Sequence, residues 1–89
     1  PGELLLSAVG TCATITLRMY AARKEWPVNK IKIELRLEEV KTESGVLNKI
    51  HEALTVEGDL DEEQYARLKS LLPKCPVARI VTGQVEIVY

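Results

Sequence analysis

The chain has 89 residues and a net charge of −1, with 12 basic and 13 acidic side chains. A chain of this size forms one small domain, buries only about 60% of its unfolded surface and is marginally stable without further support. The near-neutral charge and the few aromatic residues argue against nucleic-acid binding. Two cysteines are too few for a disulfide-rich scaffold, and a single histidine without a Cys-x-x-Cys motif predicts no metal or other cofactor. Oligomerisation is therefore the expected source of stability.

A long helix is predicted at the N-terminus, from about Glu3 to Ala22. Residues 4–17 carry no charge, and their apolar side chains occur on all sides of the helical cylinder. A helix of this kind is buried on all sides. The apolar stretch is shorter than the roughly 20 residues of a membrane span, and no basic residue precedes it as in a signal peptide. We therefore expect a soluble, cytoplasmic protein without membrane contact. Because the chain begins with Pro1 rather than Met, the sequence leaves open whether the native chain starts upstream.

The segment after Trp26-Pro27 predicts a β-hairpin. A loop at 41–45 contains Gly45 and precedes a return strand at about 46–57. The first strand alternates strictly, so one face of an antiparallel sheet is expected to be buried and the other wet. Its apolar row is Ile31, Ile33, Leu35 and Leu37.

Two positions of the return strand are polar and need an explanation. His51 falls on the polar face, where we expect it to be solvated. Glu52 falls in the same row as Ile50 and Leu54. Three explanations remain open: a bulge turns Glu52 away, Glu52 lies at the sheet rim, or Glu52 lines a site.

Helix-boundary residues predict two further helices. Asp61 is an N-cap that can form a capping box with Gln64, and Pro73 stops or kinks this helix near residue 72. Pro76 suits the first position of a new short helix, which would place Cys75 at its N-cap. The chain then alternates as a last strand through Val85, Ile87 and Tyr89.

The resulting order is helix, hairpin, helix, short helix and strand, which defines a single α+β domain over residues 1–89. Three strands and one amphipathic helix cover only one side of the first helix. The simplest remedy is a two-fold dimer in which the first helix packs against its copy. Each additional buried leucine would contribute about 1.5–3 kcal/mol.

The two cysteines are the candidate chemical groups. Cys12 in an apolar helix is either an inert small hydrophobe or, if a cation stabilises its thiolate, a nucleophile. Arg79 is a better candidate for that cation than Arg18, which points to a different face of the helix. An N-cap position would lower the pKa of Cys75 through the backbone amides. Glu3 is either a helix-terminus charge or a catalytic acid.

Two segments carry a resemblance to a known family. Glu3–Ala22 resembles the central helix of the OsmC/Ohr family of thiol peroxidases, and Cys75-Pro76-Val77-Ala78-Arg79 resembles that family's second-cysteine motif. Residues 57–64 and 82–87 are also similar in order and spacing, so the resemblance spans nearly the whole chain. It implies an OsmC-like fold, in which a long buried central helix packs on a small antiparallel sheet within an intertwined homodimer.

The resemblance also implies an activity, the reduction of organic hydroperoxides. It implies that Cys12 is the peroxidatic thiol, that Cys75 is the resolving thiol and that an external dithiol is the reductant, with Arg79 and Glu3 as possible activating or substrate-site residues. No metal is implied.

Three departures from the family pattern bear on that activity. The family carries a β-segment before this helix, with an arginine that activates the cysteine, and the chain is expected to lack it. Gly2 stands where the family has a glutamate, and Ala78 where a histidine is frequent. The alternative is therefore a catalytically impaired OsmC-like dimeric module that binds a small apolar ligand or a partner without turnover.

Overall fold

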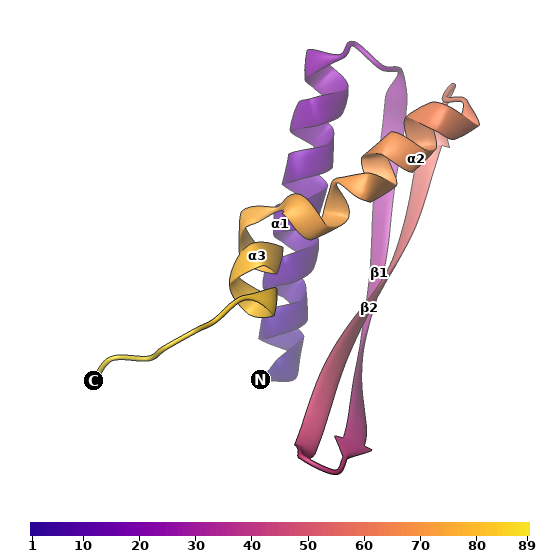
Figure 1. Cartoon of the computed structure of the whole chain (residues 1–89). Coiled ribbons are helices and arrows are strands. Elements are labelled where there is room, and N and C mark those ends of the chain that lie inside the picture. Colours follow the sequence, from indigo (N-terminus) through magenta and orange to yellow (C-terminus); the bar gives the residue numbers. More distant parts are fainter.

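The computed structural model describes all residues from 1 to 89. The elements in chain order are α1 (Gly2–Arg23), β1 (Val28–Thr42), β2 (Gly45–Gly58), α2 (Glu62–Ser70), the single 3-10 turn η1 (Leu72–Lys74) and α3 (Pro76–Thr82). The β1–β2 hairpin runs alongside α1, and its tip extends past the N-terminal end of that helix (Figure 1). Both α2 and α3 contact α1. The predicted α+β class is confirmed.

Helix α1 buries one face only within a single chain. The buried stripe consists of small and branched residues at helical spacing: Val9, Gly10, Ala13, Leu17 and Ala21. A Cβ at Gly10 would lie 2.7 Å from Leu35 Cδ1, so the glycine allows α1 and β1 to approach closely. The opposite face remains open, with Leu4 at 77% and Met19 at 60% exposure. The predicted burial on all sides is therefore not reached by one chain.

The length of α1 does not exclude a membrane span, contrary to the sequence-based argument. The helix has 22 residues, and an 18-residue window within it has a mean hydropathy of 1.4, which suffices by length and composition. Core helices of soluble proteins meet the same criteria, however. One face of α1 packs on the hairpin, α2 and α3 of the same chain. We therefore interpret α1 as the core helix of the domain.

The hairpin is longer and its turn tighter than predicted. The strands pair up to Thr42 and Gly45, so only Glu43 and Ser44 form the loop. Thr42 Oγ1 donates a hydrogen bond to the Gly45 carbonyl at 3.0 Å. Gly45 has a φ of 135°, which only glycine adopts readily. This shortens the predicted 41–45 loop.

The strand register decides the position of Glu52. Glu52 pairs with Leu35, and the only register irregularity is between Val28 and Lys30. The bulge interpretation of Glu52 is therefore wrong. Its side chain belongs to the same inner face as Ile50, as the period of two requires.

Helix α2 begins as predicted. The Asp61 carboxylate accepts a hydrogen bond from the Gln64 backbone N–H at 2.7 Å, and the Gln64 side chain accepts one from the Asp61 N–H at 3.0 Å. These two bonds complete the capping box. Tyr65 Oη donates to the Leu54 carbonyl at 2.7 Å, which ties α2 to β2. Pro73 lies in η1, so α2 ends before it.

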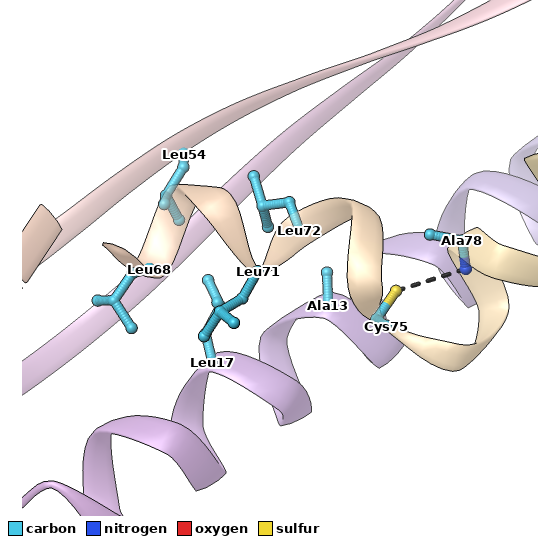
Figure 2. Close-up of a cluster of buried hydrophobic side chains, with 8 residues drawn as sticks. All are labelled: Ala13, Leu17, Leu54, Leu68, Leu71, Leu72, Cys75 and Ala78. Atoms are coloured by element: carbon cyan, nitrogen blue, oxygen red, sulfur yellow. Dashed lines mark hydrogen bonds between the residues drawn. The ribbon is translucent and has the colours of Figure 1, made fainter. Parts of the chain in front are cut away.

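The core lies where α1, β2, α2, η1 and α3 meet. Figure 2 shows eight buried side chains at this junction: Ala13, Leu17, Leu54, Leu68, Leu71, Leu72, Cys75 and Ala78. Leu17 and Leu68 are completely buried. One of the two candidate cysteines is therefore a member of the hydrophobic core.

The predicted last strand is wrong. The sheet has only two strands. Residues 84–89 form no helix or strand, and they lead away from α3 on the side opposite the hairpin (Figure 1). No strand edge lies beside the tail to supply backbone partners. Its alternating apolar side chains are exposed, at 62% for Val85 and 69% for Ile87.

The capping box predicts the effect of one substitution. Replacing Asp61 with Ala removes the acceptor for the Gln64 N–H, and we expect the free energy of unfolding to fall by about 1 kcal/mol. Asp59→Ala is the matched control, because Asp59 is exposed and lies outside the helix. Denaturant titration of both variants measures the difference. Equal losses for the two aspartates would contradict the capping role.

Candidate functional site

Cys75 lies at the start of α3, as predicted. It is the N-cap residue, Pro76 follows at the first helical position, and the Ala78 N–H donates to Cys75 Sγ at 3.4 Å (Figure 2). The side chain is only 1% exposed. The sulfur thus satisfies the Ala78 N–H, which lies in the first turn of the helix and would otherwise donate to water.

The pKa of Cys75 is raised, opposite to the sequence-based expectation. Burial makes the largest contribution, because it disfavours the thiolate. The Ala78 N–H lowers the pKa of this thiol, but the nearby Cys12 and Glu52 raise it. Cys75 is therefore held as a thiol at neutral pH.

Cys12 lies on α1 close to Cys75. The two segments are far apart in sequence, and the contact between α1 and α3 brings them together. Cys12 is among the groups that raise the pKa of the Cys75 thiol, so the two cysteines lie near each other. Both thiols are free, Cys12 half-buried and Cys75 buried. The more accessible sulfur is therefore the one on α1.

The other two predicted site residues do not join this pair. Arg79 is exposed on α3. Its backbone N–H donates to the Cys75 carbonyl at 3.1 Å, but its side chain makes no hydrogen bond or ion pair and does not contribute to the pKa of Cys75. Glu3 is exposed on the first turn of α1, about 13 Å before Cys12 along the helix axis. Glu3 lines a groove of about 540 Å³ that also touches Gly10 and Leu35.

Glu52 is the group that sequence reasoning did not assign to the site. Its Oε1 is buried and has no hydrogen-bond partner. Burial raises the pKa of Glu52, and its charge raises the pKa of Cys75. The signal was present in the sequence, as a carboxylate in an apolar row, but the pattern alone could not separate a rim position from a site.

A cavity of about 400 Å³ opens beside Glu52. Its walls come from three elements: Val9 of α1, Leu47 and Ile50 of β2, and Ala78 and Val81 of α3. Ala78 is also the residue that donates to the Cys75 sulfur. The cavity thus adjoins the thiol pair.

His51 lies on the exposed outer face of the hairpin, as predicted. Its Nε2 is 2.8 Å from Glu38 Oε1, and this hydrogen bond lowers the pKa of Glu38. The pair points away from the inner face that carries Glu52. No group of three or more His, Cys, Asp or Glu residues is arranged to hold a metal ion.

The fold and the paired thiols define a class of protein: an α+β domain with two cysteines at the contact between a long core helix and a short one. The family model for OsmC-like proteins matches residues 1–89. The chain therefore belongs to the OsmC family, as its sequence resemblance indicated.

Solved structures show the same fold. An OsmC-like protein from Mycoplasma pneumoniae superimposes with a TM-score of 0.78 at 19% identity, over 93% of this chain and 62% of that one. An osmotic stress induced and detoxification response protein from Psychrobacter arcticus gives 0.72 at 20% identity, over 89% and 57%. The chain thus spans about three fifths of the length of these two structures. No curated protein matches the chain.

The burial of the two thiols predicts their order of reactivity. With iodoacetamide at pH 7, the Cys75→Ser variant, which keeps Cys12, should be alkylated at least several-fold faster than the Cys12→Ser variant. Because the pKa of Cys75 is raised, its alkylation rate should also increase at higher pH than that of an ordinary thiol. Mass spectrometry of the native and the unfolded protein measures both rates. Faster alkylation of Cys75 in the native state would contradict this order.

Proposed function

We propose that the chain forms part of a thiol-dependent peroxidase that reduces organic hydroperoxides, with Cys12 as the peroxidatic and Cys75 as the resolving thiol. The supporting observation is the proximity of two free thiols of unequal accessibility in a member of a family that includes peroxidases. The accessible sulfur is suited to meet the substrate. The buried sulfur of Cys75 is a thiol at neutral pH, which suits it to react second, with the oxidised Cys12.

The proposed chemistry has three steps. The Cys12 thiolate attacks the O–O bond, takes one oxygen to become a sulfenic acid, and releases the alkoxide, which gains a proton to form the alcohol. The Cys75 sulfur then attacks the sulfenic sulfur, forming the disulfide while its proton leaves with the hydroxyl group as water. An external dithiol reduces the disulfide and restores both thiols. Free thiols suit a reducing compartment, and we place the protein in the cytoplasm as part of the proposal.

Peroxide titration tests the assignment. The reduced protein should consume about one equivalent of cumene hydroperoxide per chain and form an internal disulfide, because each turnover uses two thiols. The Cys75→Ser variant should stop at a sulfenic acid that dimedone traps on Cys12, and the Cys12→Ser variant should lose consumption. Peroxide consumption by Cys12→Ser at the wild-type rate would refute the proposal.

The second candidate is a dimeric module without turnover. It is favoured by the surroundings of Cys75, since no cation is among the groups that shift the pKa of this thiol and the Arg79 side chain is exposed. Activation of a cysteine nucleophile needs such a neighbour. The same titration separates the two candidates, because this module would leave the peroxide unchanged.

A homodimer is also part of the proposal. Three- and four-residue spacing places Leu4, Ala8, Cys12, Ile15 and Met19 on one face of α1, and most of this face is exposed. A stripe of this kind along a core helix is complementary to its own copy across a two-fold axis. Cys12 would then lie at the interface between the two chains.

A charge in this stripe should therefore separate the subunits. Ile15→Glu, at a side chain that is 54% exposed in one chain, should shift the protein from dimer to monomer because it would bury an unpaired carboxylate. Val46→Glu at the hairpin tip, 57% exposed, is the control and should leave the dimer intact. Sedimentation velocity over a range of concentrations measures the change. A monomeric wild-type chain would rule out the dimer.

A further inference from the structure

The second step of the proposed reaction requires Cys75 to lose its proton. The thiolate is the nucleophile in an attack on sulfur, whereas the thiol is almost inert. Cys75 is buried, and burial raises its pKa, so the thiol predominates at neutral pH. Only the Ala78 N–H lowers this pKa. A group that accepts the proton during the attack would therefore accelerate the step.

Glu52 is placed to be that group. Its pairing with Leu35 turns the side chain to the inner face of the hairpin, and its Oε1 is buried without a hydrogen-bond donor. A carboxylate oxygen in this state has free lone pairs with which to accept a proton. Burial also raises the pKa of Glu52, which makes its carboxylate a stronger base than an exposed one.

A cavity connects Glu52 with the start of α3. Ala78 lines this cavity together with Glu52, and the Ala78 N–H donates to Cys75 Sγ at 3.4 Å. The lining also includes the polar side chains of Asn48 and Thr82. The volume of about 400 Å³ has room for water. One water molecule between a carboxylate and a thiol is sufficient to transfer a proton.

The titratable groups around Cys75 leave Glu52 without a competitor. Cys12 on α1 and Glu52 on β2 are the only titratable groups that shift the pKa of Cys75, and none from α2 or η1 contributes. The Arg79 side chain on α3 is exposed, and His51 lies on the outer face of the hairpin. Cys12 is the electrophile once it is oxidised, so Glu52 remains as the acceptor.

We propose that the Glu52 carboxylate accepts the Cys75 proton, through water in this cavity, when Cys75 attacks the oxidised Cys12. The Cys75 S–H bond breaks, and its electron pair forms the S–S bond with Cys12. The Cys12 S–O bond breaks, and the leaving hydroxide takes the proton from Glu52 to form water, which restores the carboxylate. The Cys75 sulfur is oxidised and the Cys12 sulfur is reduced. The inference rests on the proposed function, because it supplies the proton acceptor for its second step.

The Glu52→Gln variant distinguishes proton transfer from a simple effect of charge. The charge of Glu52 raises the pKa of Cys75, so its removal alone would increase the thiolate fraction and accelerate the attack. Removal of a proton acceptor would instead slow the attack. Gln is neutral and of similar shape, so the variant is expected to fold. Glu57→Gln, on the exposed outer face of the same strand, is the matched control.

The experiment separates the attack of Cys75 from the reaction with peroxide. The reduced full chain at pH 7 receives less than one equivalent of dithiobis-nitrobenzoate, which reacts first with the more accessible Cys12 and releases one thionitrobenzoate. Cys75 then attacks the mixed disulfide and releases a second thionitrobenzoate, and stopped-flow absorbance gives the rate of this release. Thionitrobenzoate leaves without a proton, so the rate reports the removal of the Cys75 proton. The Cys75→Ser variant lacks the second release and is the blank.

The second release should be at least about tenfold slower in Glu52→Gln than in the wild type at pH 7. Glu57→Gln should match the wild type, and Glu52→Asp, which keeps a carboxylate, should restore part of the rate. In the wild type the rate should rise with pH through the raised pKa of Glu52 and then level off. In Glu52→Gln it should follow the hydroxide concentration until Cys75 itself ionises.

Three results would overturn the inference: an equal or faster second release in Glu52→Gln, a loss by the same factor at every pH, or a Glu52→Asp variant as slow as Glu52→Gln. Failure of the peroxidase proposal is distinguishable from these. The expected dependence on Glu52 in this assay, combined with no consumption of peroxide, would refute turnover and leave the proton acceptor in place.

Discussion

The packing of small residues of α1 against its neighbours is the constraint on which the rest of the structure depends. Gly10 admits Leu35 at a distance where a methyl group would clash, and Ala13 lies in the buried cluster beside Cys75 and Ala78. Because these small residues let its neighbours approach closely, α1 packs against both the hairpin and α3. The proximity of the two sulfurs follows from that geometry rather than from any direct bond between them.

The same helix carries two unlike faces. The buried stripe of small residues holds the domain together, whereas the exposed stripe through Leu4, Ile15 and Met19 remains without a partner in one chain. A domain of this size rarely leaves so much apolar surface on its main helix exposed to water. Cys12 lies at the border between the two faces, so any chain that covers the exposed stripe also determines the surroundings of this sulfur.

Local signals in the sequence were sufficient for much of the fold. The bounds of α1, the capping box at Asp61 and the N-cap position of Cys75 all depend on neighbouring residues and were predicted. The last strand failed because alternation shows only that a segment is compatible with a sheet, and strand formation also needs a paired edge. One-sided burial of α1 could not be predicted either, since an all-round apolar helix has the same pattern whether or not its own chain covers it.

Site chemistry was less predictable because it depends on burial. The N-cap position of Cys75 was correct, but the direction of its pKa shift was not, since desolvation outweighs the single Ala78 N–H. Arg79 could be placed on α3, yet a helix of seven residues does not reveal which side chains face the neighbouring helix. Glu52 stood out as an exception to alternation, and only the register showed that it faces inward.

The shortness of α3 has a consequence for the behaviour of Cys75. Seven residues are too few to remain helical in isolation, so this segment is ordered by its contacts with α1. A transient detachment of these few residues would melt the turn and expose the sulfur in the same event. We therefore expect the rate at which Cys75 reacts with reagents to follow local opening of the C-terminal segment.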